Sequence, residues 1–460
     1  MERLTQEQIM QLDRKDSITL ILKPTNMCNL DCTYCYDKPA RTQLASMKMS
    51  IEMVERALYM ASVYAKNVTV LWHGGEPLLM DKDFYYKATD IMLDMYSTNF
   101  KQLMQTNGYM IQKDASWVDV FKECEIKVGT SYDGAFQYVR TNTTEDDYMV
   151  RTMKILVDNG LSTCGGLTVI HNDNIREMIG MYEFLKDKFK GEYRLKYNLG
   201  FGTKEVPSEI FNIPPEDVYH YFKEFYKYML EDESNMAMLD SRFTERVQQL
   251  VDVTQTHGCE NRDCRQKWLT VLANGTLLNC SRFAIYHDFG NLMDYDSIDE
   301  IFSSEKYMKY YNLVESRLNG KCKECPVFSL CNGGCNAKFL RATEQMQLNH
   351  CEYIKNLHLA TYNALMEVEP IKNKEVIALV KRTQYFVPSI VAKVLETRFG
   401  YTEKASFNDV AEMVDSKLYR ITRRLNEFRK PIVLDMLNVQ EILKHYEDVL
   451  NIIEYEEFKR

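Results

Sequence analysis

The sequence predicts an α/β fold in the form of a partial barrel. Between residues 17 and about 232, short runs of β-branched and apolar residues alternate with longer segments of helical period. This alternation is typical of repeated βα units around a parallel sheet. Six units can be counted, too few to close an eight-stranded barrel. We therefore expect an open or partial (β/α)6 barrel with its active loops at the carboxyl ends of the strands.

Each expected strand is a short apolar or β-branched segment. The six are SITLILKP from residue 17, NVTVLWHGG from 67, KQLMQTNG from 101, EIKVGTSYDG from 125, STCGGLTVI from 162 and YRLKYNLGFG from 193. Amphipathic segments such as MSIEMVERALYMASVY and NIREMIGMYEFLKDKF lie between them and are expected to be helices.

Changes in composition divide the rest of the chain. Over residues 257–351 cysteines crowd together, turn residues such as Asn274-Gly275 appear and helical period is rarer, as expected of a small domain organised by metal. Helical patterns then return, interrupted by Pro388, Gly400 and Pro431. The expected parts are an N-terminal extension (1–16), the barrel (17–235), a helical linker (236–256), the cysteine-rich domain (257–359) and a helical C-terminal extension (360–460).

Charge and cysteine content narrow the function. The net charge of -9 argues against a nucleic-acid partner, which would require a surplus of basic residues. The N-terminus is polar and the apolar runs are too short to span a bilayer, so we expect a cytoplasmic protein without a membrane partner. Thirteen cysteines in that compartment indicate metal binding or redox catalysis.

The first cysteine motif, CNLDCTYCYD, places Cys28, Cys32 and Cys35 on one loop. It supplies three thiolates where a cubane iron-sulfur cluster needs four ligands, so one iron stays open to a small chelating molecule. A zinc site is the alternative, but zinc knuckles use CxxC pairs and four protein ligands. No fourth Cys or His is apparent nearby in the sequence.

These residues resemble the signature of the radical S-adenosylmethionine (SAM) superfamily, CxxxCxφC, with Tyr34 as the aromatic position. The segment WHGGEP after the second expected strand looks like the family's GGE motif, here Gly74-Gly75-Glu76, which meets the methionine amino group of the cofactor. The resemblance implies that an electron from the cluster cleaves SAM into methionine and a 5′-deoxyadenosyl radical. That radical then abstracts a hydrogen atom from the substrate.

Three further residues are candidate SAM contacts. GTSYDG is similar to the family segment that reaches the ribose, so Ser131 is expected to contact the ribose or the carboxylate. Arg151 sits where related enzymes direct an arginine toward the carboxylate, with a solvated helix-surface arginine as the alternative. Asn107, in QTNG, is expected at the active end of the sheet, with a turn-forming role as the alternative.

The downstream cysteines follow the pattern CX10GX4C, then CX2CX5CX3C, then a final cysteine. This pattern resembles the SPASM domain, which in its full form binds two auxiliary [4Fe-4S] clusters; two zinc ions would also be compatible with the spacing. The resemblance assigns Cys259, Cys264, Cys280 and Cys335 to one auxiliary cluster, and Cys322, Cys325, Cys331 and Cys351 to the other. The expected cofactors are thus three [4Fe-4S] clusters and SAM, while Cys124 and Cys164 remain as core residues.

SPASM enzymes as a group resemble modifiers of peptides and proteins. One possible function is maturation of a ribosomally made peptide through a thioether or carbon-carbon crosslink, and the other is formylglycine formation in sulfatases. Sulfatase maturases carry an Asp base directly after the cysteine of GX4C, where this chain has Ser281, a poor base. Tyr286, His287 or Asp288 could substitute, but we favour peptide maturation. An iron-sulfur electron carrier or a metal-stabilised scaffold is the non-enzymatic alternative.

The expected partners are a precursor peptide or protein substrate and an electron donor such as a flavodoxin or ferredoxin. About sixteen residues precede the first expected strand, so an N-terminal leader-binding domain is not expected. A separate leader-recognition protein could fill that role. The helices after residue 360 are expected to hold the substrate or that protein, or to serve packing or dimerisation.

Overall fold

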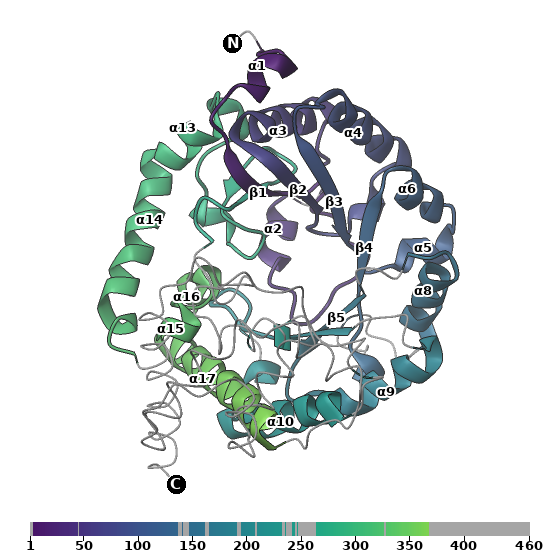
Figure 1. Ribbon diagram of the computed structural model, residues 1–460, viewed down its shortest axis with the longest axis vertical. Helices are drawn as coiled ribbons and strands as arrows, with labels where there is room; N and C mark the ends of the chain where they lie inside the picture. The colour runs from purple at the N-terminus through teal and green to yellow at the C-terminus, as the bar shows by residue number, and fades with distance from the viewer. Residues whose placement is uncertain are drawn as a thin grey trace, which may run out of the picture.

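The computed structural model describes residues 3–44, 46–136, 140, 147–161, 165–190, 195–207, 209–231, 235, 242, 243, 246, 264–325 and 328–367. Within these residues the strands form one curled sheet (Figure 1). They are β1 (Lys15–Leu22), β2 (Ala65–Trp72), β3 (Asn99–Gln105), β4 (Ile126–Ser131), β5 (Gly166–Ile170), β6 (Leu195–Leu199), β7 (Trp268–Val271) and β8 (Leu277–Leu278).

The strand order is β6-β5-β4-β3-β2-β1-β7-β8, and every neighbouring pair is parallel except β7 and β8. All six strands predicted for the partial barrel are confirmed. β7 and β8 were not expected, because their residues fall in the segment predicted to be a separate cysteine-rich domain. β7 pairs directly with β1, and Leu20 lies opposite Leu269. The barrel sheet therefore continues into the cysteine-rich region.

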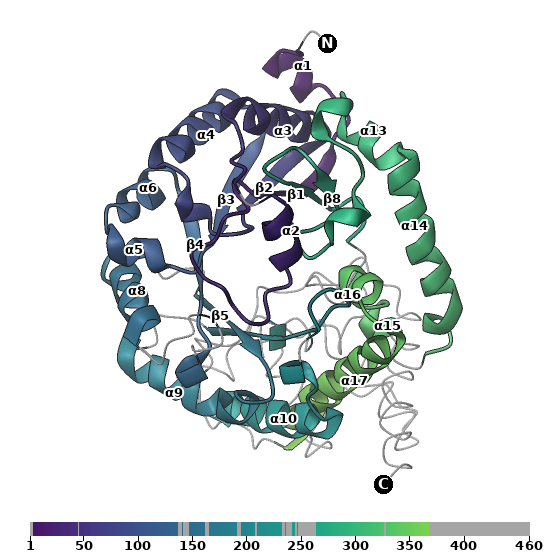
Figure 2. The same ribbon diagram turned by 180° about the vertical axis from the view of Figure 1, so that it is seen from behind.

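The structure describes fourteen α-helices, most of which form a ring around the sheet (Figure 1). They are α1 (Gln6–Met10), α2 (Lys38–Gln43), α3 (Ile51–Tyr64), α4 (Lys82–Asp94), α5 (Tyr109–Lys113), α6 (Trp117–Glu123), α8 (Asp147–Asp158), α9 (Met178–Phe189), α10 (Pro215–Glu231), α13 (Ile298–Ser303), α14 (Glu305–Arg317), α15 (Phe328–Cys331), α16 (Asn336–Arg341) and α17 (Glu344–Glu367). Single turns include η1 (Pro77–Leu79) and η2 (Gly134–Phe136). From behind, α2 lies in the middle of this ring of helices (Figure 2). No described helix is long and apolar enough to cross a membrane.

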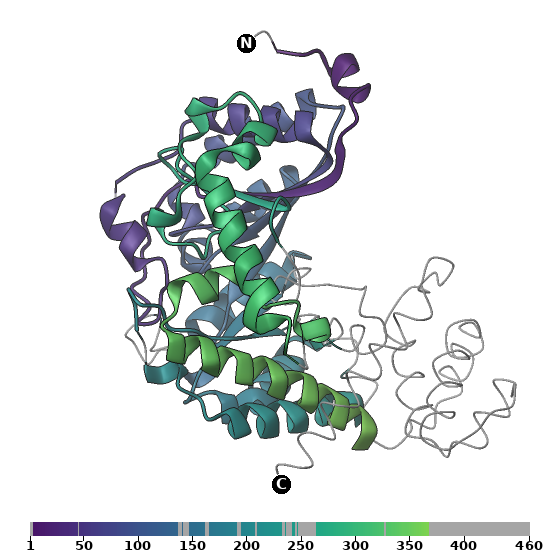
Figure 3. The same ribbon diagram turned by 90° about the vertical axis from the view of Figure 1, so that its left-hand side faces the viewer.

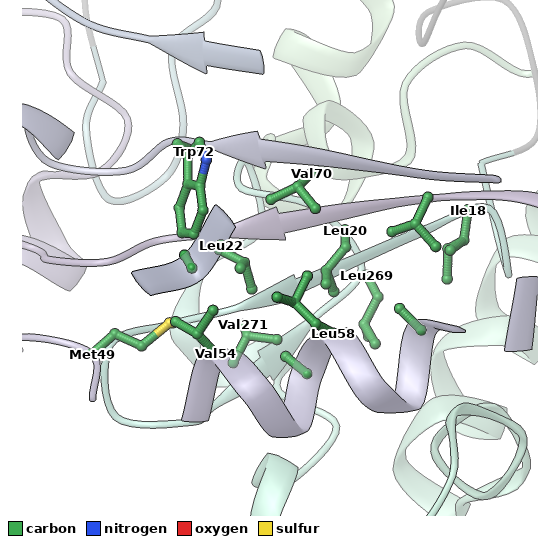
Figure 4. Close-up of a cluster of buried hydrophobic side chains, with 14 of the residues drawn as sticks. Ile18, Leu20, Leu22, Met49, Val54, Leu58, Val70, Trp72, Leu269 and Val271 are labelled. Carbon is green, nitrogen blue, oxygen red and sulfur yellow. The ribbon is translucent and has the colours of Figure 1, made fainter. Parts of the chain in front are cut away.

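Helix α3 packs against the sheet through a capped N-terminus and one apolar face. Ser50 caps its N-terminus by accepting a hydrogen bond from the amide of Met53. Val54, Leu58 and Ala61 recur at helical spacing and are fully buried. They pack on β1, β2 and β7 in a shared apolar core, where Leu20 and Leu269 lie side by side (Figure 4). One core therefore joins the barrel to the cysteine-rich region.

A second core lies at the other end of the sheet, around β5, β6 and helices α9 and α10. Helix α17 contributes Tyr353, Leu357 and Ala360 to it and runs along α10, as the side view shows (Figure 3). The boundary predicted between residues 359 and 360 therefore falls inside one continuous helix. The helices predicted beyond residue 367, most of the predicted linker and Cys164 lie outside the described residues. Cys124 is buried at the end of α6, as predicted.

Leu20 tests the shared core, because it is 1% exposed on a strand flanked by β2 and β7. We expect Leu20→Ala to lower the free energy of unfolding by about 2–5 kcal/mol, through lost burial and the cavity it leaves. The measurement is the midpoint of urea unfolding followed by circular dichroism. Leu93→Ala is the control, since Leu93 is 71% exposed. An equal shift in both variants would contradict the described core.

Candidate active site

A cavity of about 380 Å³ opens at the carboxyl end of the parallel strands. Loops after β2, β3 and β6 contribute to its wall, which is where βα folds place their active sites. Cys28, Cys32 and Cys35 line it. So do residues of the second cysteine region, namely Cys264, Cys280, Ser281, Arg282, Phe283 and Cys335. The cavity therefore lies between the two cysteine regions that the sequence singles out.

Buried polar contacts hold the three-cysteine loop in place. Lys23, at the end of β1, donates a hydrogen bond of 2.6 Å to Asp37, and both side chains are buried in this ion pair. Tyr34 donates its hydroxyl to Asp133 after β4, and its ring packs on Phe211 at 5.7 Å. The loop is thus tied to the sheet at both its start and its end.

Burial favours the protonated form of two thiols of this loop, Cys28 and Cys32. Burial raises the pKa of Cys28 and raises that of Cys32 to about 12, although the neighbouring Arg41 lowers the pKa of Cys28. The Leu30 amide and the Asn107 side-chain amide point at the Cys28 sulfur, at 3.4 and 3.8 Å. Such N–H groups and a nearby guanidinium stabilise thiolates that a metal has deprotonated. The residues present therefore fit a three-thiolate cluster site.

The Gly74-Gly75 turn touches the three-cysteine loop so closely that no side chain fits. Gly74 has φ of 95°, and a Cβ there would lie 2.4 Å from Lys23 Cε. A Cβ at Gly75 would lie 2.0 Å from the carbonyl oxygen of Met27. The Glu76 amide donates a hydrogen bond of 2.7 Å to that same carbonyl. Both glycines line the cavity, and their contact with the cofactor stays a prediction.

Glu76, the third residue of this turn, makes its side-chain contacts within the protein. Its carboxylate is fully buried and is not part of the described cavity wall. It accepts hydrogen bonds from the Leu78 amide (2.9 Å), the Thr106 hydroxyl (2.6 Å) and the Asn107 amide (2.8 Å). Burial nevertheless raises the pKa of Glu76 to about 6. The side chain therefore joins the turn after β2 to the loop after β3 instead of facing a ligand.

Asn107 fulfils both of its expected roles. It lines the cavity and donates a hydrogen bond of 2.8 Å to Asn29 on the three-cysteine loop. It also accepts a bond of 3.0 Å from the Tyr109 amide and so shapes its own turn. Tyr34 and Ser131 line the cavity as well, and Gln105 donates to the Ser131 hydroxyl at 3.3 Å.

Arg151 does not reach the site. It is exposed on α8, donates to Gln112 at 3.3 Å and is not part of the described cavity wall. The reason is the helix face, because α8 buries Val150 and Met153 against the core. Three arginines of the described residues, Arg41, Arg140 and Arg282, do line the cavity, and sequence reasoning missed them. Arg140 is the one closest in sequence to Arg151. It pairs with Asp133 at 2.6 Å and lies over the Tyr34 ring at 5.4 Å.

Cys264, Cys280 and Cys335 come together at the far wall of the cavity. Burial, with Cys264 and Cys335 as neighbours, raises the pKa of Cys280 well above its usual value. Polar hydrogens point at the sulfurs: the Asn279 amide lies 3.3 Å from Cys264, and the Arg282 guanidinium lies 3.9 Å from Cys335. Cys259, the fourth predicted ligand of this group, lies outside the described residues.

Cys322, Cys325, Cys331 and Cys351 form another group, with Cys351 supplied by α17. Burial, followed by the nearby Cys351, Cys325 and Cys322, raises the pKa of Cys331 to about 12. The structure thus places Cys331 near Cys322, Cys325 and Cys351, and Cys280 near Cys264 and Cys335. The assignment of each set to one cluster stays a prediction. In the described part of the chain, no three His, Cys, Asp or Glu side chains are arranged to hold a single metal ion.

Comparisons with known proteins agree with this arrangement. Residues 22–185 match the Radical SAM superfamily, and residues 259–326 match SPASM, described as an iron-sulfur cluster-binding domain. One relative is the cysteine-type anaerobic sulfatase-maturating enzyme of Clostridium perfringens strain ATCC 13124. It is 23% identical over 370 residues, which cover 76% of this chain and 98% of the relative.

Two solved structures share the fold. Native anSMEcpe with bound AdoMet and Cp18Cys peptide has a TM-score of 0.62 at 22% identity, over 75% of this chain and 98% of that chain. Streptococcus suis SuiB bound to precursor peptide SuiA has a TM-score of 0.50 at 16% identity, over 72% of this chain and 74% of that chain. At these identities the likeness concerns the fold alone.

Gly75→Ala tests the contact between the turn and the three-cysteine loop. The added Cβ would lie 2.0 Å from Met27 O, so the turn must move away from the loop. Since a displacement of about 1 Å can cost roughly 100-fold in rate, we expect a comparable loss in reductive cleavage of SAM. The measurement is 5′-deoxyadenosine formed by the dithionite-reduced enzyme. Gly180→Ala is the control, because its nearest neighbour would lie at 3.6 Å. Unchanged cleavage in Gly75→Ala would contradict the described contact.

The raised pKa of Glu76 predicts that the stability of the protein depends on pH. Its pKa in the folded protein is about 6, above the ordinary 4.5, so the folded state binds this proton more tightly than the unfolded state. The stabilisation is complete below pH 4.5 and is lost as the pH rises through 6, a change of about 2 kcal/mol. From pH 4 to pH 7, the free energy of unfolding of the wild type should fall by this amount relative to that of Glu76→Gln, as measured by urea unfolding. The exposed Glu123→Gln is the control, and a constant difference between wild type and Glu76→Gln would contradict the shift.

The fold, the cavity between two cysteine regions and the two family matches agree with one another. The matched segments also follow the order in which the chain builds its sheet, with the strands of the second region extending the first. The chain carries a radical SAM domain, matched over residues 22–185, and after it a SPASM iron-sulfur cluster-binding domain, matched over residues 259–326.

Proposed function

We propose that this chain is an oxidoreductase that uses SAM-derived radical chemistry to form a thioether or carbon-carbon crosslink in a ribosomally made peptide. The superfamily match and the peptide-acting relatives support an enzyme acting on a peptide or protein over an electron carrier or a scaffold. SuiB, which shares the fold, has been solved with a precursor peptide.

In this proposal the three cysteine groups hold three [4Fe-4S] clusters. Cys28, Cys32 and Cys35 hold the first, Cys264, Cys280 and Cys335 with Cys259 hold the second, and Cys322, Cys325, Cys331 and Cys351 hold the third. When bound, the first cluster supplies the electron that cleaves SAM into methionine and the 5′-deoxyadenosyl radical. Tyr34, Gly74, Gly75, Asn107 and Ser131 are the proposed SAM contacts, because all five line the cavity beside that cysteine loop.

The observation that carries the choice of reaction is Ser281. It lines the cavity directly after Cys280, and its hydroxyl lies 3.4 Å from that of Tyr36. This is the position where sulfatase maturases carry an Asp base, and a neutral hydroxyl is a poor proton acceptor. The residues that could substitute are engaged away from the described cavity wall. Tyr286 donates to Glu205, and Asp288 pairs with Lys306 at 2.6 Å. His287 also lies off the described wall.

Formylglycine formation in sulfatases is the second candidate. Its support is Asp37, a carboxylate on the cavity wall whose Oδ2 atom has no hydrogen-bond partner among the described residues. The sulfatase-maturating relative adds to this support. The ion pair between Asp37 and Lys23 argues against this candidate. Asp37 binds the Lys23 ammonium through its other oxygen, which makes the carboxylate a weaker base.

A precursor peptide, a flavodoxin or ferredoxin donor, a separate leader-recognition protein and a cytoplasmic location remain predictions of the sequence. The proposed role of the C-terminal helices in recognition concerns residues outside the described part of the chain.

The test is anaerobic incubation of the reconstituted enzyme with SAM, dithionite and two sets of peptides. One set consists of cysteine-containing precursor peptides, and the other carries a sulfatase-type Cys or Ser. We expect a product in the first set that has lost two hydrogens at a crosslink, identified by mass spectrometry. Conversion of the sulfatase-type residue to formylglycine would instead establish the second candidate.

Ser281→Ala tests the role of this position in the same assay. Removing a general base costs about 100-fold to 10,000-fold in rate. Because the hydroxyl is not a base in this proposal, we expect Ser281→Ala to keep peptide turnover within about threefold of wild type. A loss of about 100-fold or more would show that the hydroxyl takes part in proton transfer. Ser304→Ala, which removes a helix cap outside the described cavity wall, is the matched control.

A further inference from the structure

The two walls of the cavity come from segments far apart in the sequence, and one side chain connects them. Arg341, at the end of α16, is 1% exposed. Its Nη1 atom donates to the carbonyl of Arg282 at 2.7 Å, and its Nη2 atom donates to the carbonyl of Tyr36 at 3.0 Å. Its Nε atom donates to the Glu205 carboxylate at 3.2 Å. The guanidinium thus binds the three-cysteine loop, the second cysteine region and the loop after β6.

We propose that Arg341 is a positioning residue that fixes the width of the substrate end of the cavity, and with it the placement of the peptide. It acts through the backbone at Tyr36 and Arg282, not by touching substrate. The consequence for the peptide rests on the proposed function, whereas the joining of the two walls does not.

Arginine suits this task because its planar fork presents several N–H donors in fixed directions. Here the fork reaches two carbonyls and one carboxylate at the same time. A lysine offers a single point charge on a flexible stem and cannot reproduce the geometry. Removing the guanidinium would leave two partly buried carbonyl groups without these donors, which is unfavourable where water cannot replace them.

Glu205 anchors the guanidinium from its other side. It accepts a hydrogen bond from Tyr286, and the Lys204 amide donates to the Arg341 carbonyl at 2.8 Å. Burial acts to raise the pKa of Glu205, but the bonds from Tyr286 and Thr203 and the charge of Arg341 lower it to about 2. The carboxylate therefore stays ionised at neutral pH, and the ion pair persists across the working range of a cytoplasmic enzyme.

The carbonyls that Arg341 holds belong to residues whose side chains form the substrate end. Tyr36 stacks on Phe201 with ring centroids 6.0 Å apart, and the Arg282 guanidinium lies 5.7 Å from the centroid of the same ring. Ser281, next to Arg282, faces the Tyr36 hydroxyl at 3.4 Å. All four side chains line the cavity. A shift of either backbone segment would therefore change the gap in which a peptide has to lie.

The experiment compares Arg341→Met and Arg341→Lys with Arg56→Met in the full-length, reconstituted enzyme. Arg56 is a matched control, because it also connects the barrel to the cysteine-rich region. Its side chain donates from α3 to the carbonyls of Leu292, at 3.3 Å, and Tyr295. It is not part of the described cavity wall. Glu205→Gln is a milder variant that weakens the ion pair with Arg341, and it serves if Arg341→Met folds poorly.

Hydrogen-deuterium exchange followed by mass spectrometry is the first readout and needs no peptide substrate. Arg341→Met should raise exchange by at least about fivefold in both the segment 34–41 and the segment 280–284, because both lose a partner. Arg56→Met should raise it only near 291–296. Increased exchange in just one wall after Arg341→Met, or in both walls after Arg56→Met, would overturn the proposal.

The second readout is the ratio of 5′-deoxyadenosine to modified peptide. When the peptide is misplaced, 5′-deoxyadenosine forms without modification of the peptide. Arg341→Met should therefore raise this ratio by about tenfold or more, while the affinity for SAM stays within about threefold of wild type. Arg341→Lys and Glu205→Gln should raise it less, and Arg56→Met should leave it unchanged. An unchanged ratio in Arg341→Met would refute the positioning role. If wild type modifies no peptide, the proposed function fails, while the exchange readout still decides whether Arg341 joins the walls.

Discussion

The pairing of β1 with both β2 and β7 is the constraint on which the rest of the structure depends. β1 is parallel to each neighbour, so its carboxyl end delivers the three-cysteine loop between the Gly74-Gly75 turn and the second cysteine region. Leu20 and Leu269 are buried in the same core on adjacent strands, which keeps the two regions from separating. A cavity shared by both regions follows from this continuity of the sheet and needs no separate docking of two domains.

A close backbone contact and several buried polar groups then fix how the loops around the cavity lie. The turn after β2 can reach the Met27 carbonyl only because position 75 has no side chain. Glu76, buried beside it, transmits the position of this turn to the loop after β3 through hydrogen bonds to Thr106 and Asn107. Burial raises the pKa of Cys28 and of Cys280, which favours the protonated thiols, and a metal that binds these sulfurs would displace the protons. N–H groups already point at the sulfurs of Cys28 and Cys264, where they would stabilise metal-bound thiolates.

The sequence predicted the strands of the barrel because each is a short β-branched run followed by a helix. The position of QTNG after a strand pointed to Asn107, and the resemblance of GTSYDG to a family segment pointed to Ser131; both residues line the described cavity. It missed β7, a strand of four residues next to Cys264, since so short a run has no periodicity to detect. Arg151 was placed wrongly, although Met149, Val150 and Met153 already mark the buried face of α8 and leave Arg151 off it. Arg140 and Arg341 act through contacts with residues distant in sequence, which no local pattern encodes.

Helix α17 links the stability of the barrel to the last group of cysteines. It carries the proposed ligand Cys351, and two residues later Tyr353, whose hydroxyl donates to the Ile213 carbonyl at 2.7 Å. The same helix packs on α10 in the core behind β5 and β6. The place of the Cys351 sulfur beside Cys322 and Cys325 is therefore coupled to the packing of α17 on α10. Because such coupling is reciprocal, a metal cluster bound at this group would also stabilise the second half of the barrel, far from the group's own ligands.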